Sequence, residues 1–382
     1  MSTKKRTIDA FFGKPKSDFA DKAVDAKKLR AISSQPSDVT NSEQSSEVIN
    51  ENLEDEPSCA PAYSNHPTYP FPIPGLPAAL ATELPSLPAS IGHTIADQPD
   101  LDLLYFEPYL PRGSARQLFE FLRGSLPFYR VEYDIRRGGV STHIRTPRWT
   151  TVFGLDETSR FVASSSSSSS SAADTTQDGA TEIVDAKTGK KVVGDRYYDK
   201  YPPRPIPGCL DVLRRSAEAA TGCQFNFCLV NYYASGSDSI SFHSDDERFL
   251  GPLPAIASFS LGARRDFLMK HKPLPPPPPS LGEQGQAKVL QQEGKEAKPL
   301  KLPLGSGDMI LMRGTTQANW LHSIPKRTGK NAEDGGRINI TFRRAMVKGG
   351  TENYYNYNVG VGPVYKWDSA SREMKLWEPK KS

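Results

Sequence analysis

The triplet His243-Ser244-Asp245 and the distant His322 are the residues of this chain whose types and spacing are best suited to chemistry. In a strand-like segment, side chains two residues apart point the same way, so His243 and Asp245 can reach one ion. A third ligand has to come from another strand, and His322 is the candidate. Two imidazoles and one carboxylate suit Fe(II) and leave coordination positions open for oxygen chemistry. A His-x-Asp triplet alone is usually a surface accident, so its context decides its meaning.

The segment from Arg337 to Arg343 provides that context, because its side chains alternate between two faces. One face is polar and carries two guanidinium groups: Arg337, Asn339, Thr341 and Arg343. The other face is apolar and is expected to pack against another layer: Ile338, Ile340 and Phe342. A buried arginine needs an anion and matches a carboxylate with two hydrogen bonds, so a dicarboxylate cosubstrate is predicted. The alternative is an edge strand with solvated arginines.

A second strand offers polar groups to the same cavity. Residues 225–233 are predicted to form a strand in which Asn231 and Tyr233 share one face. Both side chains can donate further hydrogen bonds to the bound dicarboxylate.

Short strands separated by turns are predicted over most of the central chain. They cover residues 130–135, 140–144, 149–155, 225–233, 256–260, 266–271, 309–312 and 337–344. Helices are predicted over 111–126 and 207–220, the second ending at Gly222. This pattern predicts a mainly β fold, a barrel or sandwich with a few flanking helices.

The composition indicates that part of the chain is disordered. The 382 residues include 33 prolines and 29 glycines, and the apolar fraction of 37% is below the globular norm. We expect a mostly disordered tail over 1–95, a folded domain over 96–350 and a C-terminal extension over 351–382. Low-complexity insertions are expected at about 163–191, with a serine run, and at about 273–300, with a proline run.

Charge and cysteine usage exclude several classes. The net charge of +4 does not by itself demand a nucleic-acid partner. The four cysteines form no Cys-x-x-Cys pair, which argues against a cysteine zinc site. Neither a signal peptide nor a stretch long enough to span a membrane is present, so a reducing intracellular compartment is expected.

At these residues the chain resembles the AlkB family of Fe(II)/2-oxoglutarate-dependent dioxygenases, most closely its eukaryotic DNA-repair branch. The resemblance covers about residues 101–344, apart from the two insertions. Its motifs, in order, are Asn231-x-Tyr233, His243-x-Asp245-Asp246-Glu247, the segment Ile256 to Phe267, Gly307-Asp-Met-Ile-Leu-Met312, Trp320-x-His322-Ser-x-Pro325 and Arg337-Ile-Asn-Ile-Thr-Phe-Arg343.

The resemblance implies a double-stranded β-helix, also called a jelly roll, in which His243, Asp245 and His322 bind Fe(II). It implies that Arg343 pairs with the distal carboxylate of 2-oxoglutarate. The rest of the cosubstrate would be held by four residues: Asn231, Tyr233, Arg337 and Thr341. The implied activity uses O2 to demethylate 1-methyladenine and 3-methylcytosine in DNA, releasing formaldehyde while 2-oxoglutarate becomes succinate and CO2. Methylation at these positions blocks base pairing, which makes the base easier to flip into a pocket.

Further residues are candidates for contact with the nucleotide. Pro147-Arg148 followed by Phe153-Gly154 resembles the family's lid segment, although Phe153 stands where the family has a tyrosine. Phe153 and Trp149 are interpreted as stacking residues, with core packing as an equal alternative. Asp246 and Glu247 are candidates for the base edge or for orienting Arg265, with a solvated loop as the alternative. Three basic residues are expected to meet phosphates: Arg136, Arg137 and Arg145.

The N-terminal segment Thr7-Ile8-Asp9-Ala10-Phe11-Phe12 resembles the motif by which proteins dock on the sliding clamp PCNA. Ile8, Phe11 and Phe12 fall on one side of a single helical turn. Lys5 stands where that motif has its leading glutamine. The basic residues around the motif also fit a nuclear signal, so we expect a nuclear protein. A random apolar patch is the alternative.

Three functions remain open at this stage. The first is a monomeric enzyme acting on alkylated DNA. The second keeps the dioxygenase but changes the substrate to RNA or protein. The third is a noncatalytic, clamp-bound adaptor, against which the complete set of ligands and arginines argues.

Overall fold

A computed structural model describes residues 63–137, 139–163, 181–192, 198, 200–273, 297–329 and 334–379. The side chains of residues 135, 137, 163 and 181 are not described. The clamp-like motif at 5–12, with Ile8, Phe11 and Phe12, lies outside these residues, as do the serine and proline runs.

The larger of two main sheets has seven antiparallel strands. In spatial order they are β3 (His93–Ile95), β4 (Leu103–Phe106), β15 (Met309–Met312), β12 (Ile256–Gly262), β17 (Arg337–Arg343), β10 (Phe227–Tyr233) and β7 (Trp149–Gly154). Strand β17 is paired on both sides, with β12 and with β10. The alternative of an edge strand with solvated arginines is therefore wrong.

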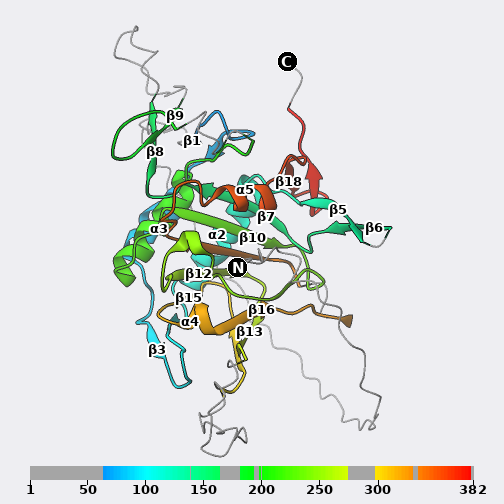
Figure 1. The fold of residues 1–382 in the computed structure, drawn as a ribbon. Helices are drawn as coiled ribbons and strands as arrows, with labels where there is room; N and C mark the ends of the chain where they lie inside the picture. Colours follow the sequence, from blue (N-terminus) through cyan, green and yellow to red (C-terminus); the bar gives the residue numbers. More distant parts are fainter. Residues whose placement is uncertain are drawn as a thin grey trace, which may run out of the picture. The chain divides into compact units, whose positions relative to one another are not determined.

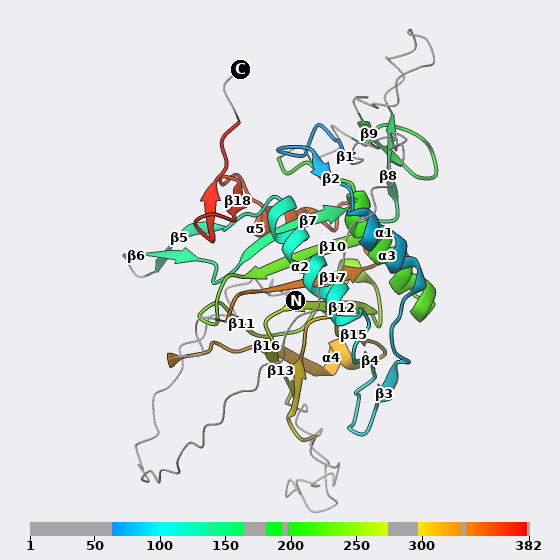
Figure 2. The ribbon, with the colours of Figure 1, turned by 180° about the vertical axis from the view of Figure 1, so that it is seen from behind.

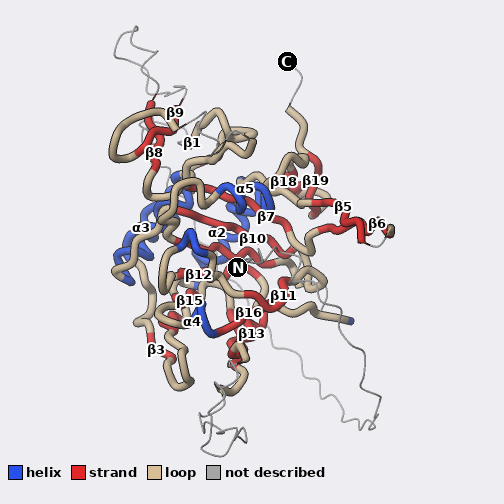
Figure 3. The backbone as a smooth tube through the Cα atoms, in the orientation of Figure 1, coloured by secondary structure: helices blue, strands red, loops and turns tan. Residues whose placement is uncertain are grey.

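The smaller main sheet has four antiparallel strands. In spatial order they are β11 (Ile240–His243), β16 (Trp320–Ile324), β13 (Arg265–His271) and β14 (Leu300–Leu304). It faces the larger sheet, because Ile310 and Met312 of β15 share one hydrophobic cluster with Phe267 and Met269 of β13. Strands dominate the described chain (Figures 1 and 3), which confirms the prediction of a mainly β, double-stranded β-helix fold.

Helices cover the outer face of the larger sheet. They are α1 (Ala78–Glu83), α2 (Arg112–Ser125) and α3 (Gly208–Thr221), seen in front of the sheet in Figure 2. Leu118 and Leu122 of α2 are fully buried in the same cluster as Ile338, Ile340 and Phe342 of β17. Helix α3 ends at Gly222 in the left-handed conformation (φ 70°), as its sequence predicts. The apolar face of β17 therefore packs under helices and turns its polar face toward the smaller sheet.

The folded region begins earlier than the predicted boundary at residue 95. Three side chains upstream of it are fully buried in the helix-side core: Ile73, Leu80 and Leu84. They come from β2 (Ile73–Pro74), α1 and the short 3-10 helix η2 (Leu84–Ser86), while β1 (Tyr63–Ser64) pairs with β2. The prediction was wrong here because proline-rich composition hides a few apolar residues that gain their burial from tertiary contacts.

The first insertion is shorter than predicted. Strand β8 (Ser159–Ala163) pairs with β9 (Thr181–Asp185), so the first insertion's distal part forms a hairpin strand. Strand β14 begins at Leu300, where the second insertion was predicted to end, and its Leu302 and Leu304 are buried. Further local elements are β5 (Glu132–Arg137) paired with β6 (Val140–Arg145), η4 (Arg248–Leu250), α4 (Thr316–Asn319), α5 (Glu352–Asn358), and β18 (Tyr365–Asp368) paired with β19 (Glu373–Leu376). Within the described ranges, no helix is long and apolar enough to cross a membrane.

Strand β7 ends at a glycine whose backbone lies very close to the backbone of the adjacent segment, Asn226–Phe227. Gly154 has φ +103°, and a Cβ there would lie 2.2 Å from the Asn226 carbonyl oxygen and 2.8 Å from the Phe227 Cα. Both neighbours are backbone atoms that belong to or precede β10. Only glycine allows this approach at this φ.

We expect Gly154→Ala to lower the free energy of unfolding by at least about 2 kcal/mol, because positive φ and the clash add together. The matched control is Gly113→Ala at an exposed position of helix α2, where a Cβ meets nothing within 4 Å. That change should be neutral or stabilising by up to about 1 kcal/mol. Denaturant unfolding measures the free energy of unfolding of both variants. Equal values would contradict the close approach of Gly154 to the Asn226 and Phe227 backbone.

Candidate metal centre and cosubstrate pocket

The three predicted metal ligands lie together between the two sheets. His243 at the end of β11 is the direct cross-strand partner of His322 on β16, with ring centroids 4.2 Å apart. Asp245 follows two residues after His243, just beyond the strand. One ligand atom from each of the three residues lies within 4.8 Å of the other two. The separation suits a single ion.

Neighbouring groups orient the two imidazoles. His243 Nδ1 lies 2.8 Å from the Ser241 carbonyl oxygen. Because a carbonyl only accepts, Nδ1 carries the proton and Nε2 keeps its lone pair for a metal. The ring of His322 stacks on Phe267 at 5.2 Å with an interplanar angle of 28°.

Burial and neighbouring charges determine the protonation states of the three predicted metal ligands. It lowers the pKa of His322 to about 3, helped by the neighbouring His243, and it also lowers the pKa of His243. Burial alone would raise the pKa of Asp245, but the Arg343 guanidinium and the two imidazoles hold it at about 2. Two neutral imidazoles and one carboxylate are the protonation states that a divalent cation requires. Their nitrogen and oxygen donors fit Fe(II).

Gln317 on helix α4 is a supporting residue that sequence reasoning missed. Its Oε1 accepts a hydrogen bond of 2.9 Å from the Asp245 backbone amide, and its Nε2 donates to Met312 Sδ at 3.2 Å. The side chain is 1% exposed, so these contacts are made in the protein interior. The sequence distinguishes Gln317 only by its position, a few residues before His322.

Arg343 lies at the metal end of the pocket. Its Nη2 donates to Asp245 Oδ2 at 2.8 Å, and its Nη1 donates to Thr341 Oγ1 at 2.6 Å. The Thr341 hydroxyl donates in turn to the Leu229 carbonyl oxygen at 2.9 Å, so it orients Arg343. These hydrogen bonds place Arg343 against a predicted metal ligand, and its pairing with the distal carboxylate of 2-oxoglutarate stays a prediction.

Arg337, at the other end of β17, has two unpartnered guanidinium nitrogens among the described residues, whereas Arg343 has one. Arg337 Nη2 donates to Ser260 Oγ at 2.8 Å, while its buried Nε and Nη1 have no partner in the part of the chain that the structure describes. Burial lowers the pKa of Arg337 to about 10, and its guanidinium lies 5.5 Å from the ring centroid of Tyr233. A buried guanidinium with two unpartnered N–H groups fits a carboxylate ligand. Asn339, between the two arginines, donates to Ser258 Oγ and the Phe259 carbonyl, both at 2.8 Å.

Asn231 and Arg148 meet at the side of this pocket. Arg148 Nε donates to Asn231 Oδ1 at 2.8 Å, and Asn231 is buried on β10. Arg148 is partly exposed, so it lies between the pocket and the surface. The structure thus brings together a residue predicted to bind the cosubstrate and one predicted to bind the substrate.

Two predicted stacking residues are core residues. Phe153 is fully buried on the helix side of β7, with its ring 6.1 Å from that of Tyr69. Trp149, four residues earlier on the same face, packs at 4.6 Å against Tyr365. Strand alternation turns both rings away from the smaller sheet. Their predicted role in stacking on a base is wrong, and the core-packing alternative holds.

Arg265 also has a structural role in place of the predicted substrate contact. It is 1% exposed, and its Nη2 donates to the Pro325 and Asp238 carbonyls at 2.7 and 2.9 Å. Neither Asp246 nor Glu247 orients it. Asp246 is exposed and pairs with Lys272 at 2.7 Å, whereas Glu247 accepts a hydrogen bond of 2.9 Å from Tyr354.

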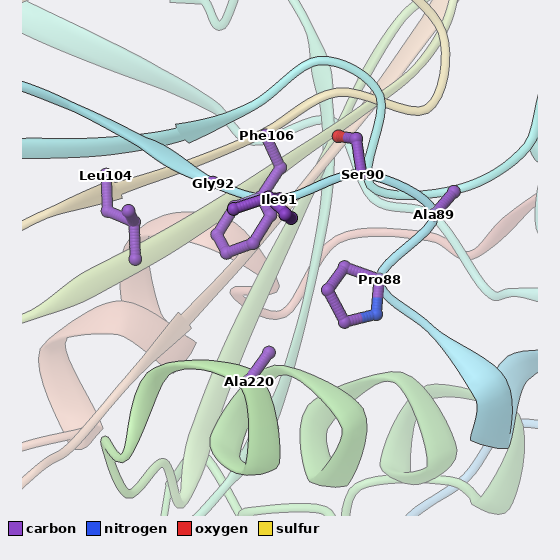
Figure 4. A pocket seen from close by; sticks show the side chains of 8 residues that line it. All are labelled: Pro88, Ala89, Ser90, Ile91, Gly92, Leu104, Phe106 and Ala220. Carbon is purple, nitrogen blue, oxygen red and sulfur yellow. The ribbon is translucent and has the colours of Figure 1, made fainter.

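The predicted phosphate contacts lie on the β5–β6 hairpin, which projects away from the larger sheet (Figures 1 and 2). Arg136 is exposed there, and Arg145 pairs with Glu132 at 2.7 Å. A separate hollow has a volume of about 440 Å³. Figure 4 shows the side chains that line it, which include Pro88, Leu104 and Ala220. None of the predicted site residues lines that hollow.

Comparisons with known proteins agree with this geometry. Residues 102–343 match the model of the 2OG-Fe(II) oxygenase superfamily. The chain is 32% identical to the DNA oxidative demethylase ALKBH2 of Arabidopsis thaliana over 64% of its own length and 67% of that relative. It is 37% identical to human DNA oxidative demethylase ALKBH2 over 38% of its length, and 38% identical to rat alpha-ketoglutarate-dependent dioxygenase alkB homolog 3 over 38%. The alignment covers 49% of the length of the human relative and 45% of the length of the rat relative.

The chain belongs to the 2OG-Fe(II) oxygenase superfamily. Within it, the chain is AlkB-like, a dioxygenase of the class that uses Fe(II) and 2-oxoglutarate. The chain spans about half the length of the mammalian relatives that it matches.

We expect Gln317→Leu to weaken metal binding roughly ten- to hundredfold, because loss of an outer hydrogen bond lets a ligand misorient. The measurement is the Kd for Mn(II) in oxygen-free buffer. Asn319→Ala on the same helix is the control, because the Asn319 side chain bonds only to the Thr315 carbonyl. Equal affinities for the two variants would show that Gln317 does not support Asp245.

Proposed function

We propose that this chain is an oxidative demethylase of N-methylated DNA bases, with 1-methyladenine and 3-methylcytosine as substrates. The observation that best supports this proposal is the cluster of His243, Asp245 and His322. Near it lies a buried arginine, Arg337, with two nitrogens unpartnered among the described residues. Two relatives that bear the name DNA oxidative demethylase support the choice of substrate.

The metal and cosubstrate ends of the pocket are held by different residues in this proposal. His243, Asp245 and His322 hold Fe(II), which when bound supplies the activation of O2 needed to oxidise a methyl group. Arg337 takes the distal carboxylate of 2-oxoglutarate, with Tyr233 beside it. Arg343 keeps the Asp245 carboxylate ionised and in place. Asn231, fixed by Arg148, lies at the wall next to the cosubstrate.

The substrate side is formed by Arg148, Asp246 and Glu247. Arg148 is partly exposed and cationic, which suits a phosphate or the rim of a base. Glu247 lies two residues after a metal ligand, so it lies near the reacting group. Oxidation of the methyl carbon gives a hydroxymethyl group that leaves as formaldehyde, and the ring nitrogen regains its unsubstituted form.

The intact pocket argues against a noncatalytic adaptor. A vestigial site would have no reason to keep a buried arginine with two unpartnered donors. An RNA substrate uses the same chemistry, so the substrate panel must include it.

The proposal predicts that protein supplied with Fe(II), ascorbate and 2-oxoglutarate releases formaldehyde from a 3-methylcytosine oligonucleotide. The panel compares single- and double-stranded DNA with RNA. His243→Ala and Asp245→Ala should reduce release below detection, since each removes a ligand. His271→Gln on β13 is the control, because His271 pairs with Asp100 outside the ligand cluster. Activity on RNA or protein alone would reject the DNA substrate, and turnover surviving both alanine substitutions would reject the metal assignment.

We further propose that the segment 5–12 docks on the sliding clamp PCNA in the nucleus, which would tether repair to replication. In this proposal, Ile8, Phe11 and Phe12 would supply the apolar side of one helical turn on the clamp. The basic flank at Lys4, Lys5 and Arg6 adds charge next to it.

Replacing Phe11 and Phe12 by alanine should weaken clamp binding at least roughly tenfold, because two buried aromatic anchors are lost. Demethylation by the isolated protein should not change. Phe19→Ala, outside the motif, is the control. Affinity for purified clamp is measured by calorimetry, and an unchanged Kd discards the docking proposal.

A further inference from the structure

Tyr354 of helix α5 contacts the active site from a segment beyond its sequence motifs. Its hydroxyl donates to Glu247 Oε1 at 2.9 Å, and the Arg343 guanidinium lies 5.5 Å from its ring centroid. Arg343 in turn donates to the metal ligand Asp245 at 2.8 Å. One side chain therefore contacts both the acidic residue after the metal ligands and the arginine that holds Asp245.

The position of Tyr354 is fixed from several sides. Its ring packs edge-on against Phe227 at 5.3 Å and in a tilted contact with Phe249 at 5.4 Å. Helix α5 is tied to β7, because the Thr150 hydroxyl donates to the Asn358 carbonyl at 2.6 Å. The hydroxyl of Tyr355 donates to the Gly154 carbonyl at 2.9 Å. A residue held this firmly by the sheet can fix a flexible carboxylate beside it.

Glu247 is left with one oxygen free. Oε1 accepts the Tyr354 hydrogen bond, whereas Oε2 is buried and has no partner among the described residues. A buried carboxylate oxygen without a donor is costly, and a ligand N–H would satisfy it. A carboxylate only accepts, so it favours an exocyclic amino group and disfavours a carbonyl at the same place.

We propose that Tyr354 is a positioning residue that holds Glu247 so that its free oxygen accepts an N–H of the substrate base. This inference rests on the proposed demethylase function and deepens it. Adenine and cytosine carry such an amino group, whereas thymine carries a carbonyl there. Tyr354 thereby sets discrimination between bases without touching the base.

The test replaces only the hydroxyl. Tyr354→Phe keeps the ring over Arg343, so the Kd for 2-oxoglutarate in Mn(II)-loaded, oxygen-free protein should not change. The KM for a 3-methylcytosine oligonucleotide should rise roughly tenfold, as expected for one lost hydrogen bond to a charged group. The ratio of 3-methylcytosine to 3-methylthymine turnover should fall with it. Tyr357→Phe on the same helix, with 40% of the side chain exposed, is the matched control.

A double variant separates positioning from folding. If Tyr354 acts through Glu247, Tyr354→Phe with Glu247→Gln should discriminate no worse than Glu247→Gln alone. Additive losses, an equal loss on both methylated bases, or weaker 2-oxoglutarate binding would overturn the inference. A wild-type protein that demethylates no oligonucleotide would instead overturn the proposed function, and this inference with it.

Discussion

The alternation of side chains along β17 is the constraint on which the rest of the structure depends. Its apolar residues pack under helix α2, so its arginines must lie between the two sheets, away from water. Burying two guanidinium groups is costly unless each finds an anion. Arg343 pairs with Asp245, whereas Arg337 pairs with no anion in the part of the chain that the structure describes. The same pattern of residues therefore creates one structural ion pair and one buried guanidinium whose N–H groups suit a carboxylate.

Much of this arrangement could be predicted from the sequence, because it depends on periodicity. Strand alternation predicted the two faces of β17 and the shared reach of His243 and Asp245. Helices α2 and α3 were predicted nearly to their ends from amphipathic spacing and Gly222. The assignment of His322 needed the resemblance to a family, since nothing local distinguishes it from His271.

The wrong predictions of substrate-contacting residues share a physical cause. The direction in which a side chain points depends on how the whole sheet is packed. Phe153 and Trp149 resemble stacking residues in sequence, but β7 turns them into the helix-side core. Arg265 looks like a substrate contact until the carbonyls around its guanidinium are known. Gln317 and Tyr354 carry no motif, and only the folded chain brings them to Asp245 and Glu247.

The position of helix α5 bears on which residues a functional fragment of this chain must include. The family match stops at residue 343, yet Tyr354 beyond it contacts Glu247 and Arg343, and Tyr355 ties α5 to β7. A fragment cut at the family boundary would keep every ligand and both arginines while opening the pocket to water on one side. The catalytic unit of this chain is thus longer than its recognisable signature, and its last part is the least conspicuous in sequence.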